Sequence, residues 1–147
     1  MITAEPRLLF VYGTLMSTAS SAMGRGPRAR LAKASSLIGR AAAPGYLFDL
    51  GDYPGLVLGL PAPARNAAGR VFGELRQLLR PIQMFDWLDR YEGIDTGATQ
   101  TAKYRRMVVD VTHLDADGRE IASPAWIYVY EGPLAGARLL TAGVWPD

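Results

Sequence analysis

Two neighbouring segments, Tyr104–Leu114 and Glu120–Tyr130, alternate between apolar and polar residues along much of their length. A period of two is typical of β-strands, because successive side chains point to opposite faces of a sheet. The short segment Asp115–Gly118 (DADG) between them has the composition of a hairpin connection. The sequence therefore predicts a long antiparallel pair of strands, around which the rest of the chain has to be arranged.

Further strands are predicted on the N-terminal side of this pair. Leu8–Tyr12 (LLFVY) is a short apolar run that ends at Gly13, which is typical of a buried strand. Leu37–Asp49 predicts extended chain with a break at Pro44–Gly45, and Arg70–Leu79 predicts a strand with alternating faces. The apolar run at Gly55–Leu60 follows a turn at Gly51–Gly55 (GDYPG), and Leu139–Trp145 adds a short terminal element.

One helix is predicted clearly and a second one less so. Pro81–Arg90 has proline in its first turn and an apolar stripe at Met84, Phe85 and Leu88. The spacing of apolar residues over Ala22–Ala34 also permits a helix, although two glycines and a proline weaken its first half.

These elements fit one domain that spans residues 1–147, with a mass of 15.9 kDa. The predicted surface loop at Pro61–Gly69 is too short to suggest a domain boundary, and Gly93–Lys103 is predicted to be a loop as well. About six strands, most of them following one another through turns, with one or two helices, predict an α+β domain. We expect a small, mainly antiparallel β-barrel that is closed or nearly closed.

The composition excludes several kinds of chemistry. The chain has no cysteine and a single histidine, His113, so cysteine nucleophiles, cysteine zinc sites and histidine-rich metal sites are excluded. No serine and acid are placed to complete a triad with His113, which we interpret as structural or exposed. No glycine-rich nucleotide-binding motif is present.

Charge and hydropathy give no indication of a nucleic-acid or membrane partner. The formal net charge is +2, and the densest basic group, within Arg25–Lys33, is interpreted as the solvated face of a helix. No apolar stretch approaches the roughly 20 residues that cross a bilayer. We expect a soluble cytoplasmic protein.

Acid–base chemistry then falls to the carboxylates, of which two stand out. Glu74 lies in the predicted strand on the same face as Phe72, and Glu92 follows the predicted helix directly in Leu88–Gly93 (LDRYEG). A carboxyl group held at the rim of a cavity is partly desolvated, and its pKa rises toward neutrality. The alternative for Glu92 is a surface charge at a helix end. Asp86 and Asp89 are interpreted as helix residues beside the apolar stripe.

The other candidate feature is Val11–Met16 (VYGTLM), where a buried strand runs into Tyr-Gly-Thr. Backbone N–H groups at such a strand end can hold a carboxylate or a developing oxyanion, and glycine lets a ligand approach closely. The alternative is an ordinary strand end with a threonine cap.

Several motifs taken together resemble a known family. They are Leu9–Met16 (LFVYGTLM), Gly45–Val57 (GYLFDLGDYPGLV), Val71–Leu75 (VFGEL), Leu88–Gly93 (LDRYEG), Tyr104–Arg106 (YRR), Ala125–Tyr130 (AWIYVY) and Gly143–Trp145 (GVW). In this order they look like the γ-glutamylcyclotransferase-like family, which includes AIG2-like proteins and γ-glutamylamine cyclotransferases. The resemblance covers nearly the whole chain.

The resemblance implies a cofactor-independent enzyme, a lyase or acyltransferase, that acts on a small γ-glutamyl amide or amine. The substrate's own α-amine attacks its γ-carbonyl, which releases 5-oxoproline and a free amine. The resemblance assigns Glu92 as the general acid/base.

The same resemblance assigns Tyr12, Gly13, Thr14 and Leu15 to substrate binding. Tyr104 either donates a hydrogen bond into the pocket or is a core tyrosine. A different kind of function remains open, in which the same fold binds a small metabolite or a protein without catalysis.

Overall fold

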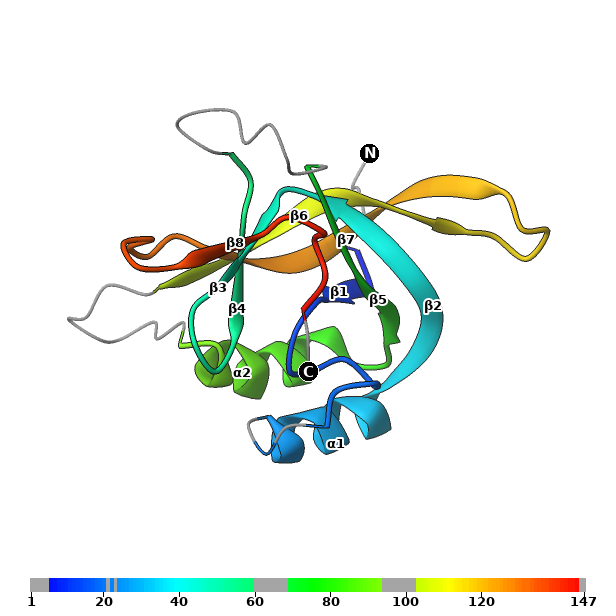
Figure 1. The fold of residues 1–147 in the computed structure, drawn as a ribbon. Helices are drawn as coiled ribbons and strands as arrows, with labels where there is room; N and C mark the ends of the chain where they lie inside the picture. The colour runs from blue at the N-terminus through cyan, green and yellow to red at the C-terminus, as the bar shows by residue number, and fades with distance from the viewer. Residues whose placement is uncertain (1–5, 21, 23, 60–68, 94–102, 146–147) are drawn as a thin grey trace, which may run out of the picture.

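The computed structural model describes residues 6–20, 22, 24–59, 69–93 and 103–145. Two helices lie together on one side of a curved sheet, and the last long hairpin extends beyond the body of the molecule (Figure 1). The elements are β1 (Leu8–Val11), α1 (Arg25–Ala34), β2 (Ser35–Pro44), β3 (Tyr46–Asp49), β4 (Pro54–Val57), β5 (Arg70–Leu78), α2 (Pro81–Tyr91), β6 (Tyr104–Leu114), β7 (Glu120–Tyr130) and β8 (Arg138–Leu140).

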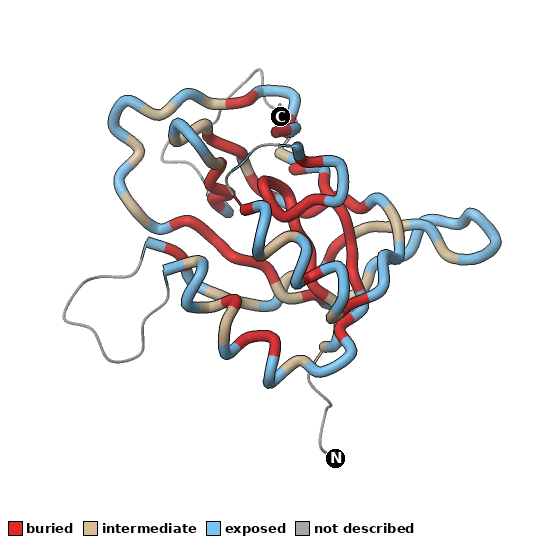
Figure 2. The backbone as a smooth tube through the Cα atoms, turned by 90° about the horizontal axis from the view of Figure 1, so that it is seen from below, coloured by how far each residue is buried: buried red, intermediate tan, exposed pale blue. Residues whose placement is uncertain are grey.

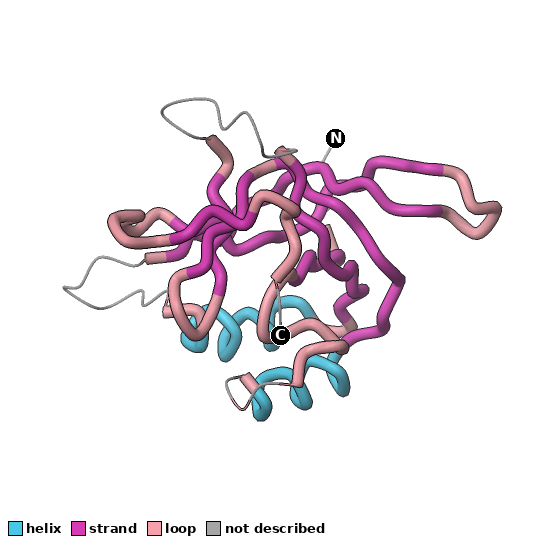
Figure 3. The backbone as a smooth tube through the Cα atoms, in the orientation of Figure 1, coloured by secondary structure: helices cyan, strands magenta, loops and turns pink. Residues whose placement is uncertain are grey.

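Five strands close into a barrel in the order β1-β5-β2-β6-β7, and β4-β3-β8 form a separate sheet (Figure 3). The barrel is mixed. β1 pairs antiparallel with β5 but parallel with β7, where Leu9 lies opposite Trp126. The remaining barrel pairs are antiparallel. The predicted α+β barrel is therefore confirmed.

The strand bounds follow the sequence patterns, with a difference in number. β6 and β7 begin and end at the predicted residues, and Asp115 closes their turn by accepting the N–H groups of Asp117 and Arg119 at 2.9 Å. The described residues contain eight strands rather than about six. The two additional strands are β3 and β8. The extended segment predicted over Leu37–Asp49 is interrupted at Gly45 and forms the two strands β2 and β3.

Two of the predicted loops fall on segments of which little is described. The predicted loops at Pro61–Gly69 and Gly93–Lys103 lie almost entirely outside the described residues.

The first helix begins at Arg25 rather than Ala22, because the preceding residue, Gly24, has a φ of 80° that an α-helix does not accept. None of the helices among the described residues is long and apolar enough to cross a membrane.

The core lies inside the barrel and between the barrel and its two helices (Figure 2). β1 is buried along most of its length, with Leu9 and Phe10 no more than 1% exposed. A strand that is buried on both faces typically has an uninterrupted apolar sequence, and Leu8–Val11 is such a sequence. The largest fully buried side chains are Phe10, Leu9, Leu31, Leu47, Leu56, Leu75, Leu78, Met84, Leu88 and Ile127.

A stacked arginine fixes α2 against the barrel. The Arg106 guanidinium on β6 lies 3.8 Å from the ring centroid of Phe85 on α2 and 4.4 Å from that of Trp126 on β7. The two rings meet edge to face with centroids 5.6 Å apart. Cation–π and aromatic contacts of this kind contribute about 0.5–2 kcal/mol each. The middle of α2 is thereby held at a defined distance from the barrel.

Close packing of β5 on β1 requires glycine at position 73. A Cβ atom there would lie 2.2 Å from the Val11 carbonyl oxygen, which is backbone and cannot turn aside. We expect Gly73→Ala to lower the free energy of unfolding by more than about 3 kcal/mol. Gly59→Ala is the matched control, because a Cβ there meets none of the described atoms within 4 Å. Urea unfolding of both variants measures the difference, and equal stabilities would contradict this packing.

Candidate active site

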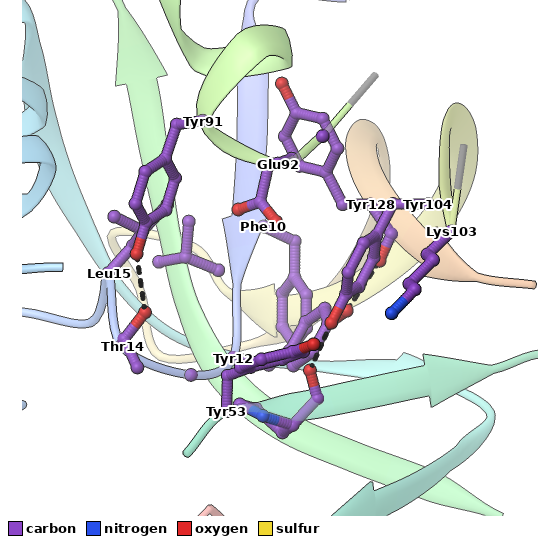
Figure 4. A pocket seen from close by; sticks show the side chains of 14 residues that line it. Phe10, Tyr12, Thr14, Leu15, Tyr53, Tyr91, Glu92, Lys103, Tyr104 and Tyr128 are labelled. Carbon is purple, nitrogen blue, oxygen red and sulfur yellow. Dashed lines mark hydrogen bonds between the residues drawn. The ribbon is translucent and has the colours of Figure 1, made fainter. Parts of the chain in front are cut away.

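A cavity of about 440 Å³ opens where β1, the end of α2 and the start of β6 meet (Figure 4). Residues 10–15 form one wall, and residues 91–93 approach from the end of α2. Residues 53–54 and 103–104, together with Tyr128, complete the lining. Cavities with a mainly apolar wall and a few convergent polar groups are the usual form of small-molecule sites.

The loop that follows β1 is held in place by a buried carboxylate. Both carboxylate oxygens of Glu74 accept hydrogen bonds from Ser17, one from its N–H and the other from its hydroxyl. The Met16 N–H donates to the Gly13 carbonyl oxygen at 3.0 Å and tightens the turn. At Gly13 the chain passes so near β4 that a Cβ would lie 2.6 Å from Pro54 Cγ.

This loop presents backbone donors at the cavity. Among the described residues, no acceptor is found for the N–H groups of Gly13, Thr14 and Leu15. On the opposite side of the backbone, the Thr14 carbonyl oxygen accepts a hydrogen bond of 2.7 Å from Arg28. The Thr14 hydroxyl lies 3.3 Å from the Tyr91 hydroxyl. Adjacent N–H groups without internal partners are suited to bind an anion.

Glu92 lies at the C-terminal end of α2 with its carboxyl group turned into the cavity (Figure 4). Its N–H donates to the Leu88 carbonyl oxygen at 2.9 Å, which fixes its backbone as the helix cap. The carboxyl group has no hydrogen-bond or ion-pair partner among the described residues. Burial, and next the nearby charge of Asp89, raise its pKa from 4.5 to about 8.

Asp89 belongs to this site, although we interpreted it from the sequence as an ordinary helix residue. Arg106 binds both of its carboxylate oxygens, at 2.9 and 3.3 Å. The Tyr128 hydroxyl donates to the same carboxylate at 2.6 Å. Two partners therefore bind the Asp89 carboxylate one helical turn before Glu92. Its i, i+3 spacing to Glu92 was the signal available in the sequence.

Three of the five tyrosines that line the cavity, Tyr12, Tyr104 and Tyr128, already donate their hydroxyl protons within the protein. Tyr12 donates to the Tyr128 carbonyl oxygen at 2.6 Å, and Tyr104 donates to the Pro54 carbonyl oxygen at 2.9 Å. Burial is the main cause that raises the pKa of Tyr12, Tyr104 and Tyr128 above the ordinary tyrosine value. They are neutral walls of the cavity. For Tyr104, this leaves the hydroxyl oxygen as an acceptor rather than a free donor.

The sequence-predicted site residues gather here, whereas two other candidates do not. Tyr12, Gly13, Thr14, Leu15, Glu92 and Tyr104 all line the cavity. Glu74 is absent from the lining because Ser17 binds it. His113 pairs with the Ser123 hydroxyl at 2.8 Å on the β6–β7 hairpin, away from the cavity lining.

Sequence reasoning missed four further lining residues with polar side chains, which are Tyr53, Tyr91, Lys103 and Tyr128. The sequence did offer an indication for Tyr128, since it lies in the aromatic strand segment Ala125–Tyr130 (AWIYVY). No sequence pattern pointed to Lys103, because it follows a segment that is predicted to be a loop. No group of His, Cys, Asp and Glu side chains in the described ranges is arranged to hold a metal ion.

Residues 9–147 match the model of a protein family described as γ-glutamyl cyclotransferase, AIG2-like. The chain belongs to this family. The match includes every residue of the cavity lining. A search of curated proteins found no match.

Solved structures share the fold. An AIG2-like protein from Mus musculus is 19% identical with a TM-score of 0.64, over 95% of this chain and 88% of that one. Protein YtfP from Escherichia coli is 26% identical with a TM-score of 0.57, over 95% and 96% of the two chains. YkqA from Bacillus subtilis is 22% identical with a TM-score of 0.61 and covers 96% of this chain. The chain spans 40% of the length of YkqA.

The raised pKa of Glu92 makes stability depend on pH. Between pH 4.5 and about 8 the folded protein binds this proton more tightly than the unfolded chain does, so the free energy of unfolding falls as pH rises. Glu92→Gln removes this penalty and is expected to stabilise the protein at pH 9 by up to about 5 kcal/mol.

Thermal unfolding of wild type and Glu92→Gln at pH 4 and pH 9 measures this effect. The exposed Glu120→Gln is the matched control. A variant no more stable than wild type at pH 9 would contradict the burial of the Glu92 carboxyl.

Proposed function

We propose that this protein converts a γ-glutamyl amide or amine into 5-oxoproline and a free amine, with Glu92 as the general acid/base. The observation that carries the proposal is the Glu92 carboxyl, which has no partner among the described residues and faces a cavity whose other wall presents backbone N–H groups. Family membership supports the reaction class.

The reaction is an intramolecular acyl transfer. The α-amino nitrogen of the glutamyl group forms a bond to the γ-carbonyl carbon, and the bond from that carbon to the leaving nitrogen breaks. The α-ammonium group gives up two protons in becoming the ring N–H. Both end on the leaving nitrogen, which departs as an ammonium group, so protons balance without water or a cofactor.

Glu92 is suited to carry these protons. A pKa of about 8 lets the same carboxyl accept a proton from an ammonium group and return it to a leaving amine near neutral pH. Tyr12, Tyr104 and Tyr128 cannot replace it, because their pKa values are raised and their hydroxyl protons are already donated.

The loop after β1 supplies hydrogen-bond donors for the negative charges of the substrate and of the transition state. We assign the N–H groups of Gly13, Thr14 and Leu15 to the glutamyl α-carboxylate and to the oxyanion that forms during ring closure, with Tyr12 in the wall beneath them. Because ring closure is intramolecular, a cavity that holds the substrate folded supplies much of the acceleration. Tyr104 contributes its ring and its hydroxyl oxygen to the wall.

The first test is release of 5-oxoproline from a panel of γ-glutamyl dipeptides, glutathione and γ-glutamyl-ε-lysine. We expect at least one compound to react, and Glu92→Gln to reduce kcat at least about 100-fold, the usual range for a general acid/base. Glu120→Gln should retain wild-type activity, since this residue is exposed on the β6–β7 hairpin.

Binding of a panel compound without release of 5-oxoproline would favour a binding module. Release that survives Glu92→Gln would overturn the assignment of the proton carrier.

Asp89 is expected to set the pH at which the enzyme becomes active. Glu92 must be ionised to accept a proton, so kcat/KM should rise with pH through about 8. Asp89→Asn removes the negative charge that helps to raise this pKa and should move the rising limb to lower pH. Asp86→Asn, on the same helix but exposed and paired with Arg90, is the control. A rising limb that stays in place or moves upward in Asp89→Asn would contradict the coupling.

A further inference from the structure

A second cavity of about 410 Å³ adjoins the first. Its walls come from the β3–β4 turn, the end of β7 and the segment that leads into β8. Tyr53 and Lys103 line both cavities, so the two spaces meet along these side chains. A molecule in the first cavity that extends past Lys103 enters the second.

The second cavity is positively charged. Lys103 and Arg138 contribute cations and Asp49 contributes the one carboxylate among its described lining residues. Asp49 is already bound to Arg138 at 3.1 Å. For the Lys103 amino group, no carboxylate of the described residues lies within ion-pair distance. Among the described lining residues, the charge left to be matched by a ligand is therefore that of Lys103.

The two ends of the first cavity present different polar groups to a ligand. Thr14 and Tyr91 lie on one side, and Lys103 lies on the opposite side, with Glu92 between them (Figure 4). The proposed assignment of the loop N–H groups to the glutamyl end puts the scissile bond near Glu92. The leaving group then points toward Lys103 and the second cavity.

We propose that the second cavity is the leaving-group subsite, and that Lys103 selects leaving amines that carry a carboxylate. γ-Glutamyl amino acids would then be preferred over γ-glutamyl amines without that carboxylate. This inference rests on the proposed function and adds the class of leaving group to it. A charge-assisted contact from an ammonium group to a carboxylate supplies the preference.

γ-Glutamyl-alanine and γ-glutamyl-ethylamide form a matched pair, because they differ only in the carboxylate of the leaving group. We expect wild type to favour γ-glutamyl-alanine in kcat/KM by about tenfold, the usual worth of one hydrogen bond to a charged group. Lys103→Gln should bring this ratio near one, mainly through KM. Lys33→Gln, which changes an exposed lysine on α1, should keep the wild-type ratio.

An equal loss on both substrates in Lys103→Gln would overturn the inference, because Lys103 would then bind the glutamyl end they share. An unchanged ratio would overturn it as well. Calorimetric binding of the same pair to Glu92→Gln, with and without Lys103→Gln, separates this inference from the proposed function. If wild type releases no 5-oxoproline, the proposed function fails, and the ratio of the two Kd values still decides the role of Lys103. Absence of binding by both compounds overturns both proposals.

Discussion

The pairing of β1 on both of its edges is the constraint on which the site depends. β1 runs antiparallel to β5 and parallel to β7, and these two pairings close the barrel. The register sets Val11 opposite Glu74, so the carboxylate that binds Ser17 stands beside the point where β1 ends. Closure thus fixes the strand, and Glu74 fixes the loop that follows it. The N–H groups that face the cavity are held in place before any ligand arrives, which is the condition for electrostatic stabilisation.

Three carboxylates near this loop have different roles because their surroundings differ. Glu74 is bound by Ser17, and Asp89 is bound by Arg106 and Tyr128. Glu92 has no such partner among the described residues, and burial raises its pKa to about 8. The division resembles the general rule that environments which separate the pKa values of neighbouring acids also separate their functions. Arg106 both packs α2 against the barrel, by stacking on Phe85 and Trp126, and binds the Asp89 carboxylate.

Local patterns in the sequence predicted the local structure well. The alternation in β6 and β7 and the proline at the start of α2 give bounds that match the structure to within one residue. Glu92 could be singled out because it follows the helix directly. The parallel contact of β1 with β7 could not be predicted, since it joins segments over 100 positions apart and leaves no periodic signal. For the same reason, the binding of Asp89 by Arg106 and Tyr128 and the position of Lys103 between two cavities needed the three-dimensional structure.

The central claim is that the substrate's own amine, rather than water, attacks the γ-carbonyl. The most direct measurement is mass spectrometry of the products formed in water enriched in oxygen-18. Ring closure predicts 5-oxoproline that carries no label, together with one equivalent of free amine. Labelled glutamate would show that water is the nucleophile and would contradict this account of the site.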